Sequence, residues 1–138
     1  MRLFKWTKAN SVFLPEIDDE HRAIFGDTGE LEQALLAGAP AFQVQEILHR
    51  LIADTEDHFA HEEKLMREAR YPSFEWHKQQ HDTVRKRMRL SAPLLEDGNA
   101  QAGREFVEFL RHWLHDHTAV PDRMLGAFLR NRQRSDAA

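Results

Sequence analysis

Apolar residues recur along most of the chain at steps of three and four positions, which places them on one face of an α-helix. No segment alternates apolar and polar residues as a half-exposed β-strand would. The helical pattern is interrupted at AGAP (37–40), YPS (71–73) and EDGNA (96–100), where proline, glycine and asparagine favour the ends of helices. The sequence therefore predicts four helices, over residues 18–37, 41–69, 73–96 and 100–130.

Four long helices joined by short connections predict an all-α fold, an antiparallel up-down-up-down four-helix bundle. We expect this bundle to span residues 17–130, after an N-terminal arm of residues 1–16. Residues 131–138 form a polar C-terminal tail, which we expect to fray. The length of 138 residues suits a single domain of this kind.

Polar residues interrupt the apolar stripe of every predicted helix. In the fourth helix, for example, the stripe passes through Leu110, Trp113, His117 and Val120. A buried polar group without a partner costs roughly 2–7 kcal/mol, and a typical domain has a net stability of only roughly 5–15 kcal/mol. These polar side chains must therefore satisfy one another or share a bound ion: His21, His58, Glu62, His77, His81 and His117.

The positions of these polar residues along the helices bring them to one end of the bundle. They lie near the start of the first and third helices and near the end of the second and fourth. Those ends meet in an antiparallel bundle. A single buried histidine is most simply a satisfied core residue. Two pairs spaced by four residues, together with histidines on the other two helices, favour a metal site instead.

Residues 58–63, HFAHEE, show how helical spacing separates chemically similar side chains. His58 and Glu62 lie on the stripe, about one turn apart, and project together. His61 and Glu63 fall off the stripe, so we expect them at the surface or in contact with the site from its flank. Two further histidines of the fourth helix also fall off the stripe and are expected to be exposed: His112 and His115.

The residue types in the cluster narrow the choice of metal. The chain has no cysteine, which excludes disulfides, iron–sulfur clusters and thiolate metal sites. Imidazole and carboxylate ligands suit iron. Ferritin-like di-iron proteins use paired Glu-x-x-His motifs. This chain has only one, Glu46–His49, which we expect at the surface.

Four motifs resemble those of the hemerythrin family, in particular the single-domain bacteriohemerythrins: IDDEH ending at His21, HFAHEE, HKQQH and HDHTAVPD. The resemblance covers residues 6–126. It implies a non-heme di-iron centre, in which an oxo or hydroxo group bridges two iron ions. The implied ligands are His77, His81 and His117 for one iron, His21 and His58 for the other, and Glu62 and Asp122 as bridges.

Asp122 follows His117 by five residues, which on a regular helix turns the two side chains about 140° apart. We therefore predict a π-bulge or a break within residues 116–124. Pro121 has no N–H, and its ring clashes with the carbonyl four residues back, that of His117. We expect Pro121 to help set the irregularity that turns Asp122 inward.

The resemblance implies reversible O2 binding, for storage, delivery or scavenging, rather than an enzymatic reaction. The O2 pocket is expected to be apolar, because water promotes oxidation of the irons. Thr118 stands where the family usually has isoleucine, and its hydroxyl could hydrogen-bond to ligand or water, or bond back to its own helix. We expect faster autoxidation with threonine than with isoleucine. The expected pocket residues are Ile24, Phe59, Trp113, Leu114 and Thr118.

Two other functions are compatible with the same motifs. One is a sensor of oxygen, iron or redox state that acts through a separate protein partner, since the short segments outside the bundle disfavour a fused signalling domain. The other is a di-iron oxidase or peroxidase, which is disfavoured because the stripes hold no further acid, base or nucleophile. The mild net charge of −4 and the lack of a long apolar run predict a cytoplasmic protein that binds neither nucleic acid nor membrane.

Overall fold

The computed structural model describes residues 4–137 as helices joined by short connections. A short 3-10 helix, η1 (Lys8–Asn10), lies in the N-terminal arm. Four longer helices follow: α1 (Pro15–Leu36), α2 (Ala41–Glu68), α3 (Phe74–Glu96) and α4 (Ala100–His117). A π-helical segment, η2 (Thr118–Asp122), then joins α4 to α5 (Arg123–Ala137). The described residues contain no β-strand.

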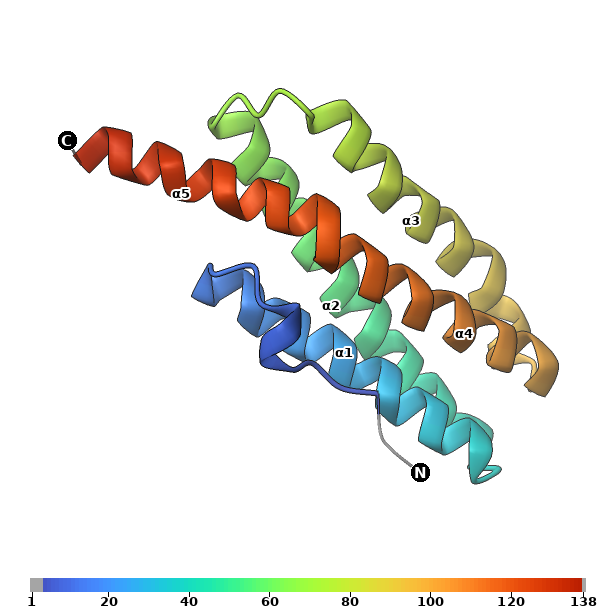
Figure 1. Ribbon diagram of the computed structural model, residues 1–138. Helices are drawn as coiled ribbons and strands as arrows, with labels where there is room; N and C mark the ends of the chain where they lie inside the picture. Colours follow the sequence, from blue (N-terminus) through green and yellow to red (C-terminus); the bar gives the residue numbers. More distant parts are fainter. Residues whose placement is uncertain (1–3, 138) are drawn as a thin grey trace.

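Helices α1 to α4 form an antiparallel bundle in which each helix packs against two neighbours (Figure 1). This arrangement confirms the predicted all-α four-helix bundle. Helices α4 and α5 follow each other nearly in line, so they and η2 form one rod (Figure 1). In the described part of the chain, no helix is both long enough and apolar enough to cross a bilayer.

The C-terminal helix differs from the expectation in its length. The polar tail, expected to fray from residue 131, continues α5 as far as Ala137. Leu125 and Leu129 are buried against the rest of the protein and anchor the first turns of α5. Adding residues to a helix that is already formed is much easier than nucleating one, so α5 propagates into the exposed residues that follow.

Capping residues set the ends of the helices. Gly98 follows α3 with φ +80°, a left-handed conformation that glycine adopts without strain. Asn99 caps α4, as the sequence predicts, by accepting a hydrogen bond from the Ala102 N–H at 3.0 Å. Helix α1 begins at Pro15 rather than at residue 18, because proline suits a first helical turn, which needs no N–H.

Among the residues that the structure describes, the buried apolar side chains form two clusters. The larger one fills the bundle and includes Ile24, Phe59 and Leu114. The smaller one is formed by the arm, the α2–α3 connection, α5 and the adjacent ends of α1 and α2: Val12, Leu14, Ile17, Met66, Ala69, Tyr71, Leu125 and Leu129. In α1, His21 lies along the chain between Ile17 of the smaller cluster and Ile24 of the larger one. The predicted metal residues therefore lie where the two clusters meet.

The N-terminal arm is held against the bundle by close backbone contacts. A Cβ atom at Gly29 would lie 2.4 Å from the carbonyl oxygen of Phe4, and one at Gly126 would lie 2.5 Å from the carbonyl oxygen of Val12. Asp18 reinforces the contact by accepting a hydrogen bond from the Val12 N–H at 2.9 Å. Only glycine allows the arm to approach α1 and α5 this closely.

Gly29→Ala is expected to destabilise the protein by about 1–3 kcal/mol, because the new methyl group would collide with the Phe4 backbone. Gly26→Ala is the matched control on the same helix, since beyond the helix itself no atom of the described residues lies within 4 Å of a Cβ atom at that position. This control should stabilise the protein by roughly 0.5–1 kcal/mol through better helix propensity. Urea unfolding measures both, and effects of the same sign would contradict the docking of the arm.

Candidate metal centre

Seven polar side chains from α1, α2, α3, α4 and η2 meet in the interior of the bundle. All are at most 3% exposed: His21, His58, Glu62, His77, His81, His117 and Asp122. They form two overlapping groups. In each group, every residue offers one nitrogen or oxygen atom, and all of these atoms lie within 4.8 Å of one another. One group holds His77, His81 and His117, the other holds His21 and His58, and both include Glu62 and Asp122. The structure therefore brings all the residues predicted as ligands into one buried cluster.

The spacing of these atoms fits the coordination of metal ions. Two ligand atoms at right angles around an ion, each at roughly 2.1 Å, lie about 3.0 Å apart. The Nε2 atoms of His21 and His58 are 3.0 Å apart, and those of His77 and His117 are 3.1 Å apart. Asp122 reaches both groups, with Oδ2 at 3.1 Å from His21 Nε2 and Oδ1 at 3.0 Å from His117 Nε2. A carboxylate in this position could bind two ions at once.

The carboxylate oxygens of the cluster are buried with few hydrogen bonds. Among the described residues, none donates a hydrogen bond of acceptable geometry to Asp122 Oδ1, Asp122 Oδ2 or Glu62 Oε2. An unpartnered buried carboxylate is destabilising by several kcal/mol, and a metal ion between these groups would satisfy it. A donor set of five imidazoles and two carboxylates suits iron.

In the metal-free protein, the negative charge of the carboxylates favours protonation of the histidine His77. Burial and the nearby Asp122 carboxylate raise the pKa of Glu62, but His58, His77 and His81 outweigh both and hold it below its ordinary value. Burial lowers the pKa of His77, but Asp122 and Glu62 outweigh it and raise this pKa to about 9. The two carboxylates therefore create a site for positive charge, carried by protons or by metal ions.

Three of the five histidines are oriented by a hydrogen bond from their outer ring nitrogen, Nδ1. The pairs are His58 with Glu20 at 2.6 Å, His81 with Glu63 at 2.8 Å, and His117 with Gln80 at 3.0 Å. A carboxylate can only accept, so the proton of His58 and His81 lies on Nδ1. When the ring is neutral, Nε2 then keeps its lone pair and faces the cluster, which is the tautomer that binds a metal through Nε2.

The acceptors Glu20, Glu63 and Gln80 share a position in the sequence that the apolar stripe does not mark. Each is adjacent to a cluster residue of its own helix and bonds to a histidine of the next helix. One step along a helix rotates a side chain by about 100°, which turns it from the core toward the neighbouring helix. His61 also lies on this flank and donates to Glu20 at 2.7 Å, so it is half-buried rather than exposed.

Segment η2 confirms the predicted irregularity after His117. Residues Thr118–Asp122 form a π-helical turn, which is wider than an α-helical turn and brings Asp122 round to the face of His117. Pro121 lies inside this turn and is buried. The wider turn also explains why Val120, predicted on the apolar stripe, is 55% exposed. The inward positions are 121 and 122 instead.

Two of the five expected pocket residues stack directly on histidines of the cluster. Phe59 lies parallel to His81 with ring centroids 4.0 Å apart, and Trp113 lies parallel to His117 at 4.1 Å. Phe59 and Trp113 also meet edge to face at 5.7 Å. The remaining three are buried: Ile24, Leu114 and Thr118. The Thr118 hydroxyl donates to the Leu114 carbonyl at 2.8 Å, so it bonds back to its own helix.

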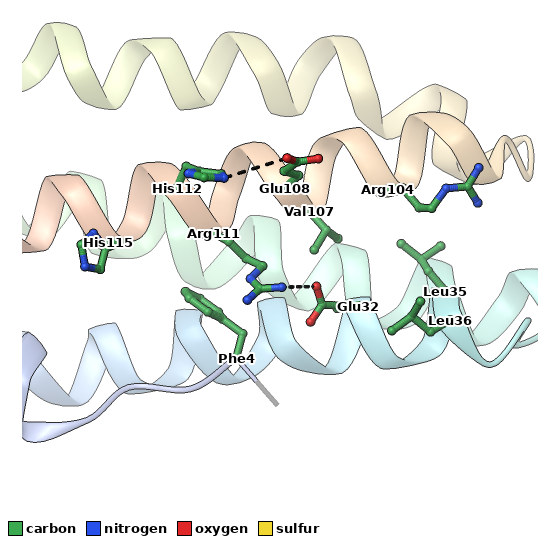
Figure 2. A pocket seen from close by; sticks show the side chains of 10 residues that line it. All are labelled: Phe4, Glu32, Leu35, Leu36, Arg104, Val107, Glu108, Arg111, His112 and His115. Carbon is green, nitrogen blue, oxygen red and sulfur yellow. Dashed lines mark hydrogen bonds and ion pairs between the residues drawn. The ribbon is translucent and has the colours of Figure 1, made fainter. Parts of the chain in front are cut away.

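A groove of about 560 Å³ lies apart from the cluster, between α1 and α4 (Figure 2). His112 and His115 line this groove, as expected for histidines off the apolar stripe, and no cluster residue lines it. A third lining residue, Arg111 of α4, pairs with Glu32 of α1 at 2.8 Å, and Figure 2 shows this pair linking the two helices. His49, from the single Glu-x-x-His motif, has an exposed side chain, as predicted.

Comparison with known proteins places the chain in a family. The model of the hemerythrin HHE cation binding domain matches residues 12–129. A bacteriohemerythrin of Ralstonia nicotianae is 36% identical over 85 residues, or 62% of each chain, so the match spans less than two thirds of that relative. A bacteriohemerythrin of Stenotrophomonas maltophilia is 32% identical over 125 residues, 88% of this chain and 78% of the relative. A myohemerythrin of Theromyzon tessulatum is 28% identical over 120 residues, 86% and 88% of the two chains. Because the domain match covers most of the sequence and includes the whole buried cluster, the chain belongs to the hemerythrin family.

Proposed function

We propose that the chain binds O2 reversibly at two iron ions held by the buried cluster. The ions, when bound, would supply the electrons that O2 binding requires. The protein supplies the ligands, a dry pocket and fixed ring orientations. The proposed ligands are His77, His81 and His117 for one ion, His21 and His58 for the other, and Glu62 and Asp122 for both.

The observation that carries this proposal is the pair of overlapping ligand groups with two shared carboxylates. Two ferrous ions bring four positive charges, of which two carboxylates and one hydroxide offset three, so the loaded site can be buried at a tolerable cost. The group with His21 and His58 offers four protein ligands, whereas the other group offers five. The four-ligand position therefore leaves room for a small external ligand.

Reversibility requires the chain to keep water away from the site. The seven proposed ligands are nearly inaccessible to solvent, and Phe59 and Trp113 cover the rings of His81 and His117. The two apolar clusters on either side of the ligands extend this dry surrounding. We propose that these side chains protect the ions from solvent-assisted oxidation.

Thr118→Ile is expected to slow autoxidation by roughly threefold, a change of about 0.6 kcal/mol in the barrier that is typical of one weak hydrogen bond. The hydroxyl proton of Thr118 is directed to the Leu114 carbonyl, but its oxygen can still accept a hydrogen bond from a water molecule. The autoxidation rate is measured by spectrophotometry, as the loss of the visible absorption of the oxygenated protein with time. Equal rates in the two proteins would reject a role for the hydroxyl.

Anaerobic loading with Fe(II), exposure to O2 and then degassing tests the proposed function. A visible absorption band that appears with O2 and disappears on degassing, with two irons per chain, is the expected result. His58→Ala should abolish the band, and His112→Ala, a groove histidine outside the cluster, should keep it. Sustained consumption of a reductant under O2 would overturn the proposal in favour of an oxidase or peroxidase.

A further inference from the structure

We propose that Arg85 is a positioning residue that sets how strongly His81 donates electrons to the metal centre. It acts on His81 through the carboxylate of Glu63, and it also packs over Phe59, whose ring covers His81. The proposal rests on the proposed function to the extent that His81 binds an iron ion. It adds a residue that lies outside the ligands and the pocket.

The first contact is a carboxylate oxygen shared by Arg85 and His81. Glu63 Oε2 accepts from His81 Nδ1 at 2.8 Å and from Arg85 Nη1 at 2.7 Å. Glu63 is 6% exposed, so little solvent screens either bond. The guanidinium draws charge from this oxygen, which makes Glu63 a weaker acceptor for the N–H of His81.

The second contact runs through the aromatic ring that covers His81. The guanidinium of Arg85 lies over the ring of Phe59, 5.2 Å from its centroid. Phe59 in turn stacks on His81, with ring centroids 4.0 Å apart. Arg85 therefore holds both the hydrogen-bond partner of His81 and the ring that packs on its face.

Arg85 is itself fixed in place. Its Nε and Nη2 bond to the carboxylate of Glu56 at 2.9 Å and 3.0 Å, and Nη1 also bonds to Asp82 at 2.9 Å. Only 21% of its side chain is exposed. A planar guanidinium held by several carboxylates keeps one orientation, which a flexible ammonium would not reproduce fully.

The outer hydrogen bonds of the cluster then differ in charge between the two metal positions. His58, in the two-histidine group, donates to Glu20, whose other oxygen accepts from His61. His117, in the three-histidine group, donates to Gln80, a neutral amide. Arg85 offsets part of the charge of the Glu63 carboxylate, so both acceptors seen in the three-histidine group carry less negative charge than Glu20 does. The outer hydrogen bonds therefore strengthen electron donation by the histidines less at the three-histidine position than at the two-histidine position.

Arg85→Gln is expected to favour the oxidised centre about tenfold, equivalent to a potential about 59 mV lower for a one-electron step. Without Arg85, Glu63 accepts more strongly from His81, whose ring becomes a better electron donor. Equilibrium redox titration of the iron-loaded protein measures the shift. Arg85→Lys should have a potential close to that of the unsubstituted protein, because the positive charge near Glu63 remains. Arg89→Gln, which removes an exposed arginine one turn further along α3, should leave the potential unchanged.

The route through Glu63 is tested by a double-mutant cycle. Glu63→Gln alone should raise the potential, and Arg85→Gln should change it little once Glu63 has been replaced. Thermal unfolding of the metal-free variants separates loss of stability from the redox effect. An unchanged potential in Arg85→Gln with two irons bound, or additive effects in the double variant, would overturn the proposal. Since potential rather than O2 binding is measured, a failure of reversible O2 binding leaves this test intact.

Discussion

Glu62→Gln is expected to lower the metal affinity of the chain by more than about a hundredfold and to leave fewer than two ions per chain. Replacing a residue that only supports a ligand typically costs 10–100-fold in affinity, so loss of a ligand shared by two ions should cost more. Glu62 Oε1 lies 3.0 Å from His81 Nε2 and 3.3 Å from His77 Nε2, and Glu62 Oε2 has no hydrogen-bond donor among the described residues. An amide keeps the shape of the side chain but removes the negative charge.

Metal content after dialysis, measured by elemental mass spectrometry, checks this expectation. Glu68→Gln is the matched control, because Glu68 is an exposed carboxylate near the end of the same helix and pairs only loosely with Lys64 at 3.8 Å. The control should bind two ions per chain. Two tightly bound ions in Glu62→Gln would contradict the shared-ligand assignment. Circular dichroism confirms that the variant keeps its helices before metal content is compared.

The residues that face the core could be predicted from the sequence because helical spacing alone determines them. His58 and Glu62 share the stripe of α2, and both are buried in the structure. Asp122 could be included only through the family resemblance, since a regular helix would turn it away from His117. Segment η2 resolves that conflict by inserting a wider turn. The same turn explains the one stripe residue that is largely exposed, Val120.

The residues that support the ligands could not be predicted from the stripe. Glu63 falls off the stripe of α2 in the same way as many solvated glutamates, yet it is 6% exposed and bonds to His81. Whether such a residue meets a ligand depends on the angle and spacing between neighbouring helices, and one-dimensional periodicity does not contain that information. The length of α5 depends on a similar long-range contact, because Leu125 and Leu129 are anchored by the distant arm.

Removal of the metal by a chelator is expected to destabilise the protein by about 8 kcal/mol. An ion whose free concentration is a thousand times its dissociation constant stabilises the folded protein by about 4.1 kcal/mol, and two such ions double this value. For a chain of this length, such a change corresponds to a fall of roughly 15–30 °C in Tm. The unpartnered oxygens of Asp122 and Glu62 would then be compensated only by protons on the surrounding histidines.

The gap in Tm between metal-loaded and metal-free protein is expected to widen as pH rises from 6.5 to 9. In the metal-free protein, Asp122 and Glu62 raise the pKa of His77 to about 9, above its ordinary value of about 6.5. The stability from protonated His77 is complete below pH 6.5 and is lost as pH rises through 9. Metal ions require the deprotonated ring, so they bind more tightly over the same range. Calorimetry at pH 6.5, 7.5 and 9 measures both forms, and a constant gap would show that metal and protons do not compete for this cluster.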